Sequence, residues 1–293
     1  MFHIFELFSL YPTFFYTITF IISLMIGSFL NVVIHRLPIM MEKNWKAEFN
    51  SYFDNDDSTS SNTEPAFNLA TPGSTCPKCG HKIKAWENIP LISWLIQRGK
   101  CTSCRAAISA RYPLVELLTG LLSLVIAFHF GPTYACLAAL ILTWSLIALT
   151  FIDADTMLLP DQITLPLLWL GLLISIDSIF VTPTEAIIGA TAGYLVLWSL
   201  FWGFKLLTGK EGMGYGDFKL LAALGAWVGW QHLAIIVILS SFVGAILGII
   251  ILSIKGKDKN IPIPFGPYLA IAGWLTFLYG DWIAQQYWGY VLG

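Results

Sequence analysis

Residues 218–254 read FKLLAALGAWVGWQHLAIIVILSSFVGAILGIIILSI, a run of 37 residues in which Lys219 is the only charged side chain. As one α-helix this run would be about 55 Å long, whereas the hydrocarbon core of a bilayer is about 30 Å thick. The run is too long for one membrane crossing and therefore predicts two. We expect the chain to fold back near Trp230, Gln231 and His232.

The composition of the whole chain is typical of a membrane protein. Of its 293 residues, 56% are apolar and 12% are charged, against about 25% charged in an ordinary soluble domain. A net charge of −2 offers no broad basic surface, which argues against nucleic acid as a partner. Residues 37–111 are polar, whereas residues 112–293 are mostly long apolar runs. We therefore expect several membrane spans and one soluble insert.

The predicted fold is an all-α integral membrane protein. About 20 mostly apolar residues cross a bilayer as a helix, and we predict about eight such transmembrane helices, with a small cytoplasmic insert between helices 1 and 2. The predicted domains are the first span (1–35), the insert (36–112) and a seven-span domain (113–293). The predicted spans are 12–34, 113–130, 134–152, 163–181, 185–206, 218–230, 233–254 and 262–280.

The basic residues predict the orientation of these spans. With eight crossings and the first residue outside, all 16 Lys and Arg residues fall on one side of the membrane. The positive-inside rule identifies that side as the cytoplasm. A single span over 218–254 would instead put Lys219 and Lys255 on opposite sides. We therefore expect eight crossings, with both chain ends outside.

The insert contains a polar stretch and two cysteine pairs. Residues 51–65, SYFDNDDSTSSNTEP, are acidic and poor in aliphatic side chains, which predicts a flexible loop. Cys76 and Cys79 form one CxxC pair, and Cys101 and Cys104 form a second after 21 intervening residues. Two such pairs at this separation suit a structural zinc ion held by four thiolates. Unrelated reduced thiols or redox pairs are the alternatives. His81 follows the first pair and is expected to be a neighbour of the metal site rather than a ligand.

Two groups of carboxylates lie at predicted span ends. Asp153 and Asp155 end the third span, and Asp217 opens the sixth within GYGDFK. The predicted topology puts both groups at the cytoplasmic boundary, where two carboxylates can share one proton and activate water against a peptide carbonyl. That chemistry is typical of aspartyl proteases. The alternative is that these residues only cap helices or lie at the membrane surface.

The remaining acidic residues have other predicted roles. Asp161 follows Pro160 and precedes a new apolar run, which predicts a helix N-cap. Glu116 is a candidate partner for Arg111 or for another charge on the inner side. Asp177, Glu185 and Asp281 fall on the opposite side and are poor catalytic candidates.

Several motifs together resemble one protein family, the bacterial type IV prepilin leader peptidases, also called prepilin peptidase/N-methyltransferases. They serve type IV pili and type II secretion. The similarity extends from near the N-terminus to the sixth span and beyond. The matching stretches are GSFLNVVIHRLP (27–38), MMEKNW (40–45), CPKCGHKI (76–83), ENIPLISWL (87–95), GKCTSCRAAISARYPLVE (99–116), DADTMLLPDQITLPLLW (153–169), GYGDFKL (214–220) and IPFGPYLA (263–270).

The resemblance implies a function and a location. Asp153 and Asp217 match the two catalytic aspartates of these intramembrane peptidases of the GxGD type. Family members cut the basic leader of prepilins and pseudopilins after a Gly, then methylate the new N-terminal residue, commonly Phe, with S-adenosylmethionine. The four-cysteine insert is typical of members with both activities. A multi-pass protein of the bacterial inner membrane is expected, with both chain ends periplasmic.

Three points stay open at the level of sequence. A peptidase without methyl transfer is one alternative function. An ion-coupled transporter using Asp153 and Asp217 is another, although the lack of charged residues in the middle of the spans argues against it. No glycine-rich fingerprint indicates which residues bind S-adenosylmethionine, and the sequence specifies neither the physiological pilin nor the oligomeric state.

Overall fold

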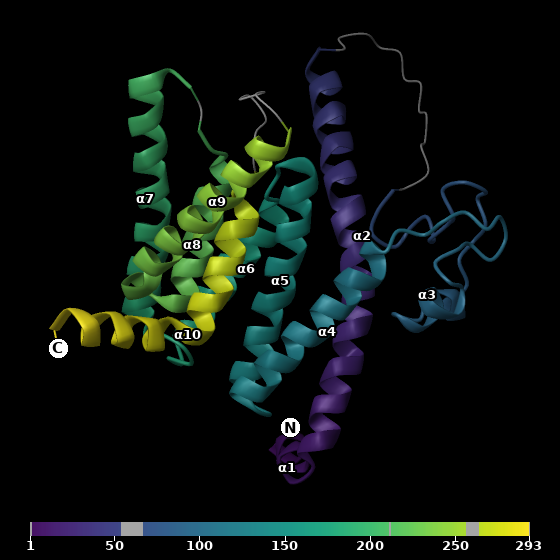
Figure 1. Cartoon of the computed structure of the whole chain (residues 1–293), viewed down its shortest axis with the longest axis horizontal. Helices are drawn as coiled ribbons and strands as arrows, with labels where there is room; N and C mark the ends of the chain where they lie inside the picture. The colour runs from purple at the N-terminus through teal and green to yellow at the C-terminus, as the bar shows by residue number, and fades with distance from the viewer. Residues whose placement is uncertain (1, 54–66, 211, 256–263, 293) are drawn as a thin grey trace. The chain divides into compact units, whose positions relative to one another are not determined.

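The computed structural model of the chain describes residues 2–53, 67–210, 212–255 and 264–292 (Figure 1). Throughout these ranges the secondary structure is helical, with isolated β-bridges only at Thr75–Lys82 and Lys100–Ala107. The helices are α1 (Phe2–Leu10), α2 (Pro12–Phe53), η1 (Ala85–Asn88), α3 (Ile92–Ile96), α4 (Arg111–Phe130), α5 (Tyr134–Thr156), α6 (Asp161–Ser175), α7 (Pro183–Thr208), α8 (Tyr215–Val228), η2 (Trp230–His232), α9 (Leu233–Lys255) and α10 (Gly266–Leu292).

The all-helical membrane fold is confirmed. Each predicted span overlaps one long helix, and in the described ranges α2, α4, α5, α7 and the segment Trp230–Ile250 are long and apolar enough to cross a bilayer. The helices α6 and α8 are shorter, with 15 and 14 residues. The number of membrane crossings stays a prediction.

The expected fold-back in the long apolar run is present. Helix α8 ends at Val228, and the 3₁₀ turn η2 (Trp230–His232) leads into α9. Gly229 joins them with φ of +77°, a backbone conformation that glycine adopts without steric strain.

Helix α2 extends further than the sequence predicted. It continues to Phe53, whereas the predicted span ended at residue 34 and the loop began at residue 51. Beyond the apolar stretch the chain MEKNWKAEFN is rich in good helix formers, and Lys46 pairs with Glu42 one turn away. The start of the predicted loop is therefore helical, and residues 54–65 lie outside the described part of the chain.

The chain divides into two compact units, Met1–Pro132 and Thr133–Gly293. In the first unit α2 packs along α4, and a Cβ at Gly27 of α2 would lie 2.7 Å from the Cα of Glu116. Helices α2 and α4 thus belong to one compact unit, and the domain bounds expected from the sequence stay a prediction.

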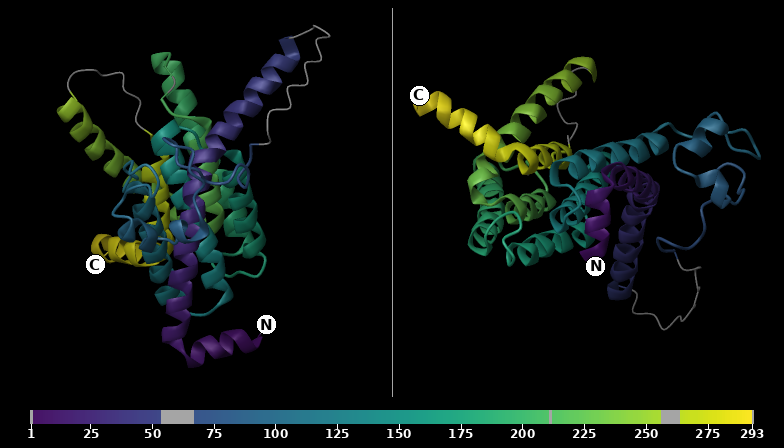
Figure 2. Two further views of the ribbon diagram at one scale, coloured as in Figure 1. Left: turned by 90° about the vertical axis from the view of Figure 1, so that its right-hand side faces the viewer. Right: turned by 90° about the horizontal axis from the view of Figure 1, so that it is seen from below.

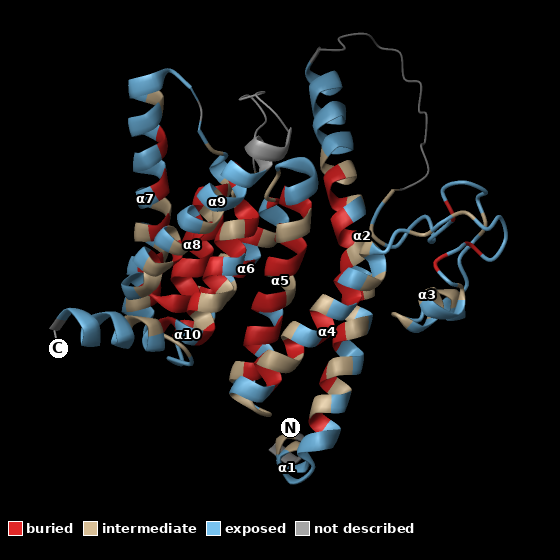
Figure 3. Cartoon of the chain, in the orientation of Figure 1, coloured by how far each residue is buried: buried red, intermediate tan, exposed pale blue. Residues whose placement is uncertain are grey.

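In the second unit α8 contacts α6, α7 and α10 (Figures 1 and 2). Consequently every α8 residue from Asp217 to Val228 except Lys219 is buried (Figure 3). A helix enclosed in this way packs its apolar side chains against protein rather than lipid.

Helices α7 and α8 approach each other closely at two glycines. A Cβ at Gly189 would lie 2.2 Å from the carbonyl oxygen of Gly225, and a Cβ at Gly225 would lie 2.2 Å from that of Gly189. Such approach of two helices requires residues without side chains. In contrast, Gly203 of α7 has open space where its Cβ would be.

We expect Gly189→Ala to destabilise the second unit by about 1–3 kcal/mol, because the added methyl group overpacks the α7–α8 contact. Thermal unfolding of the purified protein in detergent measures the change. Gly203→Ala is the matched control and should be neutral or stabilising by up to about 1 kcal/mol, since alanine favours helix over glycine. Equal unfolding temperatures for the two variants would contradict a tight α7–α8 contact at Gly189.

Candidate functional site

Asp153 lies in the last turns of α5 and is 5% exposed. The N–H of Gly266, at the start of α10, donates a hydrogen bond of 2.9 Å to its Oδ2. A Cβ at Gly266 would lie only 2.7 Å from the same oxygen. The backbone of α10 can therefore approach the carboxylate this closely only because residue 266 is a glycine.

Asp217 lies in the first turn of α8 and is 6% exposed. Its Oδ2 accepts a hydrogen bond of 3.2 Å from the N–H of Gly214, which precedes the helix. This bond satisfies one of the N–H groups that a helix start leaves without a backbone acceptor. Asp217 thus both caps its helix and remains buried.

The two carboxylates belong to one site. Leu159, in the link between α5 and α6, packs against both neighbouring glycines: a Cβ at Gly216 would lie 2.7 Å from its Cβ, and a Cβ at Gly266 would lie 3.1 Å from its Cδ2. The two carboxylates are also close enough to interact electrostatically. Two buried carboxylates in this relation can share one proton, so that one acts as a base and the other as an acid.

The other acidic residues of this region lie elsewhere. Asp155 is exposed, although it is only two residues from Asp153. The predicted N-cap role of Asp161 is wrong, because Pro160 precedes the helix and Asp161 is already its first residue. Both carboxylate oxygens of Asp161 instead accept hydrogen bonds of 2.7 Å from Lys219 of α8. This ion pair joins the starts of α6 and α8, a role that the sequence did not reveal.

Two of the three acidic residues expected on the opposite side, Glu185 and Asp281, have structural partners. Glu185 accepts a hydrogen bond from the N–H of Thr182 at the start of α7 and another from Gln231 in η2. Asp281 of α10 pairs with His232 at 3.1 Å. Both residues therefore join helix ends through η2.

The four cysteines of the insert form one cluster. The Sγ atoms of Cys76 and Cys104 are 3.8 Å apart, those of Cys79 and Cys101 are 4.0 Å apart, and all four lie within 4.8 Å of one another. A tetrahedral zinc ion with Zn–S bonds of about 2.3 Å requires sulfur atoms about 3.8 Å apart. The cluster therefore has the dimensions and the donor atoms of a closed metal site.

The two cysteine pairs lie in equivalent turns, a first knuckle (75–82) and a second knuckle (100–107). In the first, the N–H of Gly80 donates to the carbonyl of Cys76, and in the second the N–H of Arg105 donates to that of Cys101. Hydrogen bonds from the N–H groups of Lys78 and Cys79 lower the pKa of the Cys76 thiol to about 6. Corresponding bonds in the second knuckle lower the pKa of Cys101. The turns thus favour the thiolate form, which binds metals, at Cys76 and Cys101. The pKa of Cys79 is instead raised to about 11, because burial and the neighbouring thiols outweigh the hydrogen bond from the N–H of His81.

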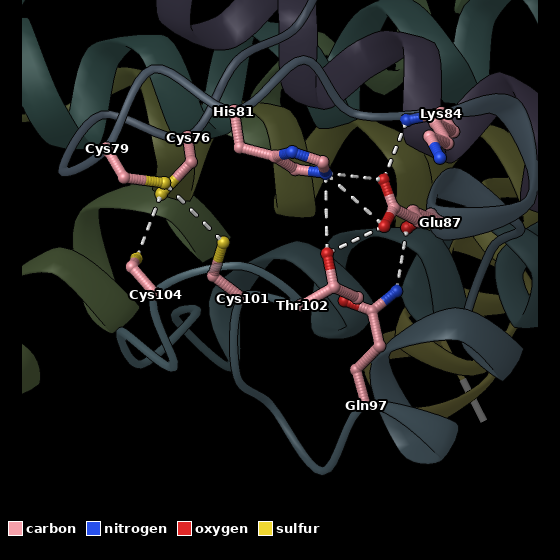
Figure 4. A network of polar contacts seen from close by, with 9 residues as sticks. All are labelled: Cys76, Cys79, His81, Lys84, Glu87, Gln97, Cys101, Thr102 and Cys104. Carbon is pink, nitrogen blue, oxygen red and sulfur yellow. Dashed lines mark hydrogen bonds and ion pairs between the residues drawn. The ribbon is translucent and has the colours of Figure 1, made fainter.

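Glu87 of η1 links the two knuckles (Figure 4). Its carboxylate accepts hydrogen bonds from the Lys84 N–H at 2.8 Å and from the Thr102 hydroxyl at 2.7 Å, and it lies 3.1 Å from His81 Nε2. The bonds from Lys84 and Thr102, with the nearby His81, lower the pKa of Glu87 to about 2. The carboxylate form therefore stabilises this network above the ordinary pKa of a glutamate, and the stabilisation is lost as the pH falls through about 2.

His81 points to Glu87 and is outside the cysteine cluster. It is therefore a neighbour of the cluster and not one of its ligands, as the sequence predicted. Sequence reasoning missed Glu87. In the sequence, the signal for Glu87 was that it is the one acidic residue between the two cysteine pairs.

Comparison with known proteins identifies relatives over nearly the whole chain. Residues 21–130 match the bacterial peptidase A24 N-terminal domain, and residues 140–249 match the type IV leader peptidase family. The prepilin leader peptidase/N-methyltransferase of Aeromonas hydrophila is 62% identical over 94% of this chain and 94% of its own length. Proteins of the same name from Pseudomonas aeruginosa and Neisseria gonorrhoeae are 56% and 48% identical, over 94% and 92% of each chain. No solved structure matches the chain.

Proposed function

Since this chain belongs to the prepilin leader peptidase/N-methyltransferase family, we propose that it cleaves prepilin leaders with Asp153 and Asp217 and then methylates the new N-terminus. The observation that carries the catalytic assignment is the pair of buried carboxylates, each fixed by a backbone N–H. The chain is thus a membrane peptidase and N-methyltransferase whose substrates are prepilins. We extend these substrates to the pseudopilins of type II secretion.

The peptidase step follows from one proton shared by two carboxyl groups. The ionised carboxylate takes a proton from a water molecule while the water oxygen attacks the carbonyl carbon of the leader's last residue, the glycine. The protonated carboxyl group then gives its proton to the leaving nitrogen as the C–N bond breaks. The products are a leader with a new carboxylate and a pilin with a free amine. The aspartate pair again holds one proton.

The second step transfers a methyl group to that amine. S-adenosylmethionine supplies the methyl group when it is bound, and we assign this activity to the insert, residues 36–112. The residues of the dyad and those of the cysteine cluster belong to different compact units, so the two activities should be separable by mutation.

We assign zinc to Cys76, Cys79, Cys101 and Cys104. Four thiolates leave no open position on a tetrahedral ion, so the site is structural rather than catalytic. Its contribution is to fold the insert, because the two knuckles are joined mainly through the ion and Glu87.

We also propose that the chain lies in the bacterial inner membrane with the insert in the cytoplasm and both ends in the periplasm. The basic leader of a prepilin is then on the same side as the insert, and its apolar helix enters the bilayer. The scissile bond falls at the membrane boundary, where the C-terminal end of α5 and the start of α8 meet.

We expect Asp153→Asn and Asp217→Asn each to lower leader cleavage by about 10²–10⁴-fold, because neither carboxyl group alone can act as both base and acid. Cleavage of a synthetic prepilin by the purified protein measures this. Methyl transfer to an already cleaved pilin should continue in both variants. Asp155→Asn is the matched control and should retain cleavage, and the reverse pattern would exclude Asp153 as a catalytic residue.

We expect one zinc ion per chain by metal analysis of protein purified without chelators. Replacing any one of Cys76, Cys79, Cys101 or Cys104 by Ser should remove the zinc and impair methyl transfer more than cleavage. Cys136→Ser is the matched control, because this buried cysteine of α5 lies outside the cluster. Protein that contains no zinc, or that loses it in the Cys136→Ser variant, would contradict the assignment.

We expect cysteines introduced at Thr133 and Thr184 to react with a membrane-impermeant reagent added from the periplasm. Cysteines introduced at Lys82 and Lys210 should react only after the membrane is opened. The damaging result is periplasmic labelling at Lys210, since it would put the GYGD segment on the far side from the leader that it must cut.

A further inference from the structure

Glu116 is a buried acidic residue that the peptidase site does not use. It is the sixth residue of α4 and is 7% exposed, about 7 Å along the helix axis from Arg111. The backbone of α2 lies directly against that of Glu116 at Gly27, and Ser28 of the same helix lies beside the carboxylate. The carboxylate is therefore held between two membrane helices.

The Glu116 carboxylate binds a strained turn of the insert. Its Oε2 accepts a hydrogen bond of 2.9 Å from the N–H of Leu91. Leu91 has φ of +61° and ψ of −50°, and the N–H of Ile92 donates to the carbonyl of Pro90 at 2.6 Å. This is a γ-turn of the rare, strained kind. Such a conformation persists only where the surroundings hold it, and here the Glu116 bond does so.

The turn leads directly into α3, a short helix with an unusual surface. Its residues Ile92, Leu95 and Ile96 are 55%, 66% and 76% exposed. Their i, i+3, i+4 spacing puts them on one face of the helix. Trp94 instead faces the insert, where its Nε1 donates to the carbonyl of Ile108 at 3.3 Å. An aliphatic face of three side chains, the outer face, is thus turned away from the insert.

The turn at Leu91 is bound to α4 at Glu116, and the position of Glu116 along α4 indicates what the outer face of α3 contacts. Because the N–H of Leu91 reaches a side chain more than one turn into a spanning helix, α3 lies level with the first turns of α4 (Figure 1). The span predicted from the sequence begins at residue 113 of α4, which puts the expected bilayer surface at that level. Short apolar helices there bury their aliphatic side chains at the boundary of headgroups and acyl chains.

We propose that α3 is a membrane-surface anchor of the insert, with Ile92, Leu95 and Ile96 in contact with lipid, and that Glu116 is the positioning residue that holds it there. The anchor fixes the insert relative to the ends of α2 and α4. A further part of the proposal rests on the proposed function: methyl transfer depends on this anchor, whereas leader cleavage does not.

The lipid contact is tested by a photo-cross-linking amino acid at position 96 in the full chain, in vesicles of phosphatidylethanolamine and phosphatidylglycerol. We expect lipid adducts from position 96 and none from position 82, an exposed site in the first knuckle. Absence of lipid adducts at position 96, or adducts to added prepilin in their place, would overturn the proposal.

The role of Glu116 is tested by Glu116→Leu, with Glu116→Gln as the matched control. Loss of the acceptor oxygen should abolish lipid adducts at position 96 and lower methyl transfer at least about tenfold, while cleavage stays within about twofold of the parent chain. Glu116→Gln retains an acceptor oxygen and should rescue both readouts. Wild-type methyl transfer in Glu116→Leu would overturn the positioning role, as would equal losses of both activities.

A second variant probes the same bond from the other side, in case Glu116→Leu fails to insert. Leu91→Pro removes the N–H and cannot adopt a positive φ, whereas Leu91→Gly keeps the N–H and relieves the strain. We expect the first to lose methyl transfer and the second to retain it. These measurements distinguish failure of the proposed function from failure of the anchor. If the parent chain shows no methyl transfer, the proposed function fails. If the parent chain and Leu91→Pro both transfer methyl groups normally, only the anchor is refuted.

Discussion

A backbone N–H directed at a buried carboxylate is the interaction on which both units depend. In an apolar environment an unpaired carboxylate is costly, and so is an N–H without an acceptor. Each satisfies the other at Asp153 and Gly266, at Asp217 and Gly214, and at Glu116 and Leu91. Within the described part of the chain, a backbone N–H therefore serves each of these three buried acids as a hydrogen-bond partner.

Close backbone approach makes these contacts possible, and glycine makes the approach possible. Gly266 brings the start of α10 to Asp153, and Gly27 brings α2 to the backbone beside Glu116. The same requirement sets the α7–α8 contact, where Gly189 and Gly225 touch. As a result α8, which carries Asp217 in its first turn, is enclosed by other helices. A rigid, water-poor setting of this kind strengthens the interaction between two carboxylates.

The insert is built on a different principle. It has little apolar core, and its two knuckles are held by four thiolates around one position and by the hydrogen bonds of Glu87. A metal ion bound by this cluster would supply stability that a small domain cannot obtain from burial alone. The insert contacts the spanning helices through the strained turn at Leu91, which binds Glu116 of α4, and through Arg36 of α2, which donates to the carbonyl of Asn68. The two buried aspartates and the cysteine cluster of the insert thus have separate structural supports within one chain.

The sequence by itself determined the class of fold, the fold-back after Val228, the four-cysteine cluster and the choice of Asp153 and Asp217 as candidates. Those features depend on hydrophobicity along the chain and on the spacing of a few residue types, which are local properties. The sequence did not reveal the roles of Gly266, Lys219, Glu87 or Leu91, and it misplaced the end of α2 and the role of Asp161. Gly266 is 113 residues from Asp153, and Lys219 is 58 residues from Asp161. Only the tertiary structure decides such pairs, because packing of whole helices determines which backbone N–H or side chain meets a buried carboxylate.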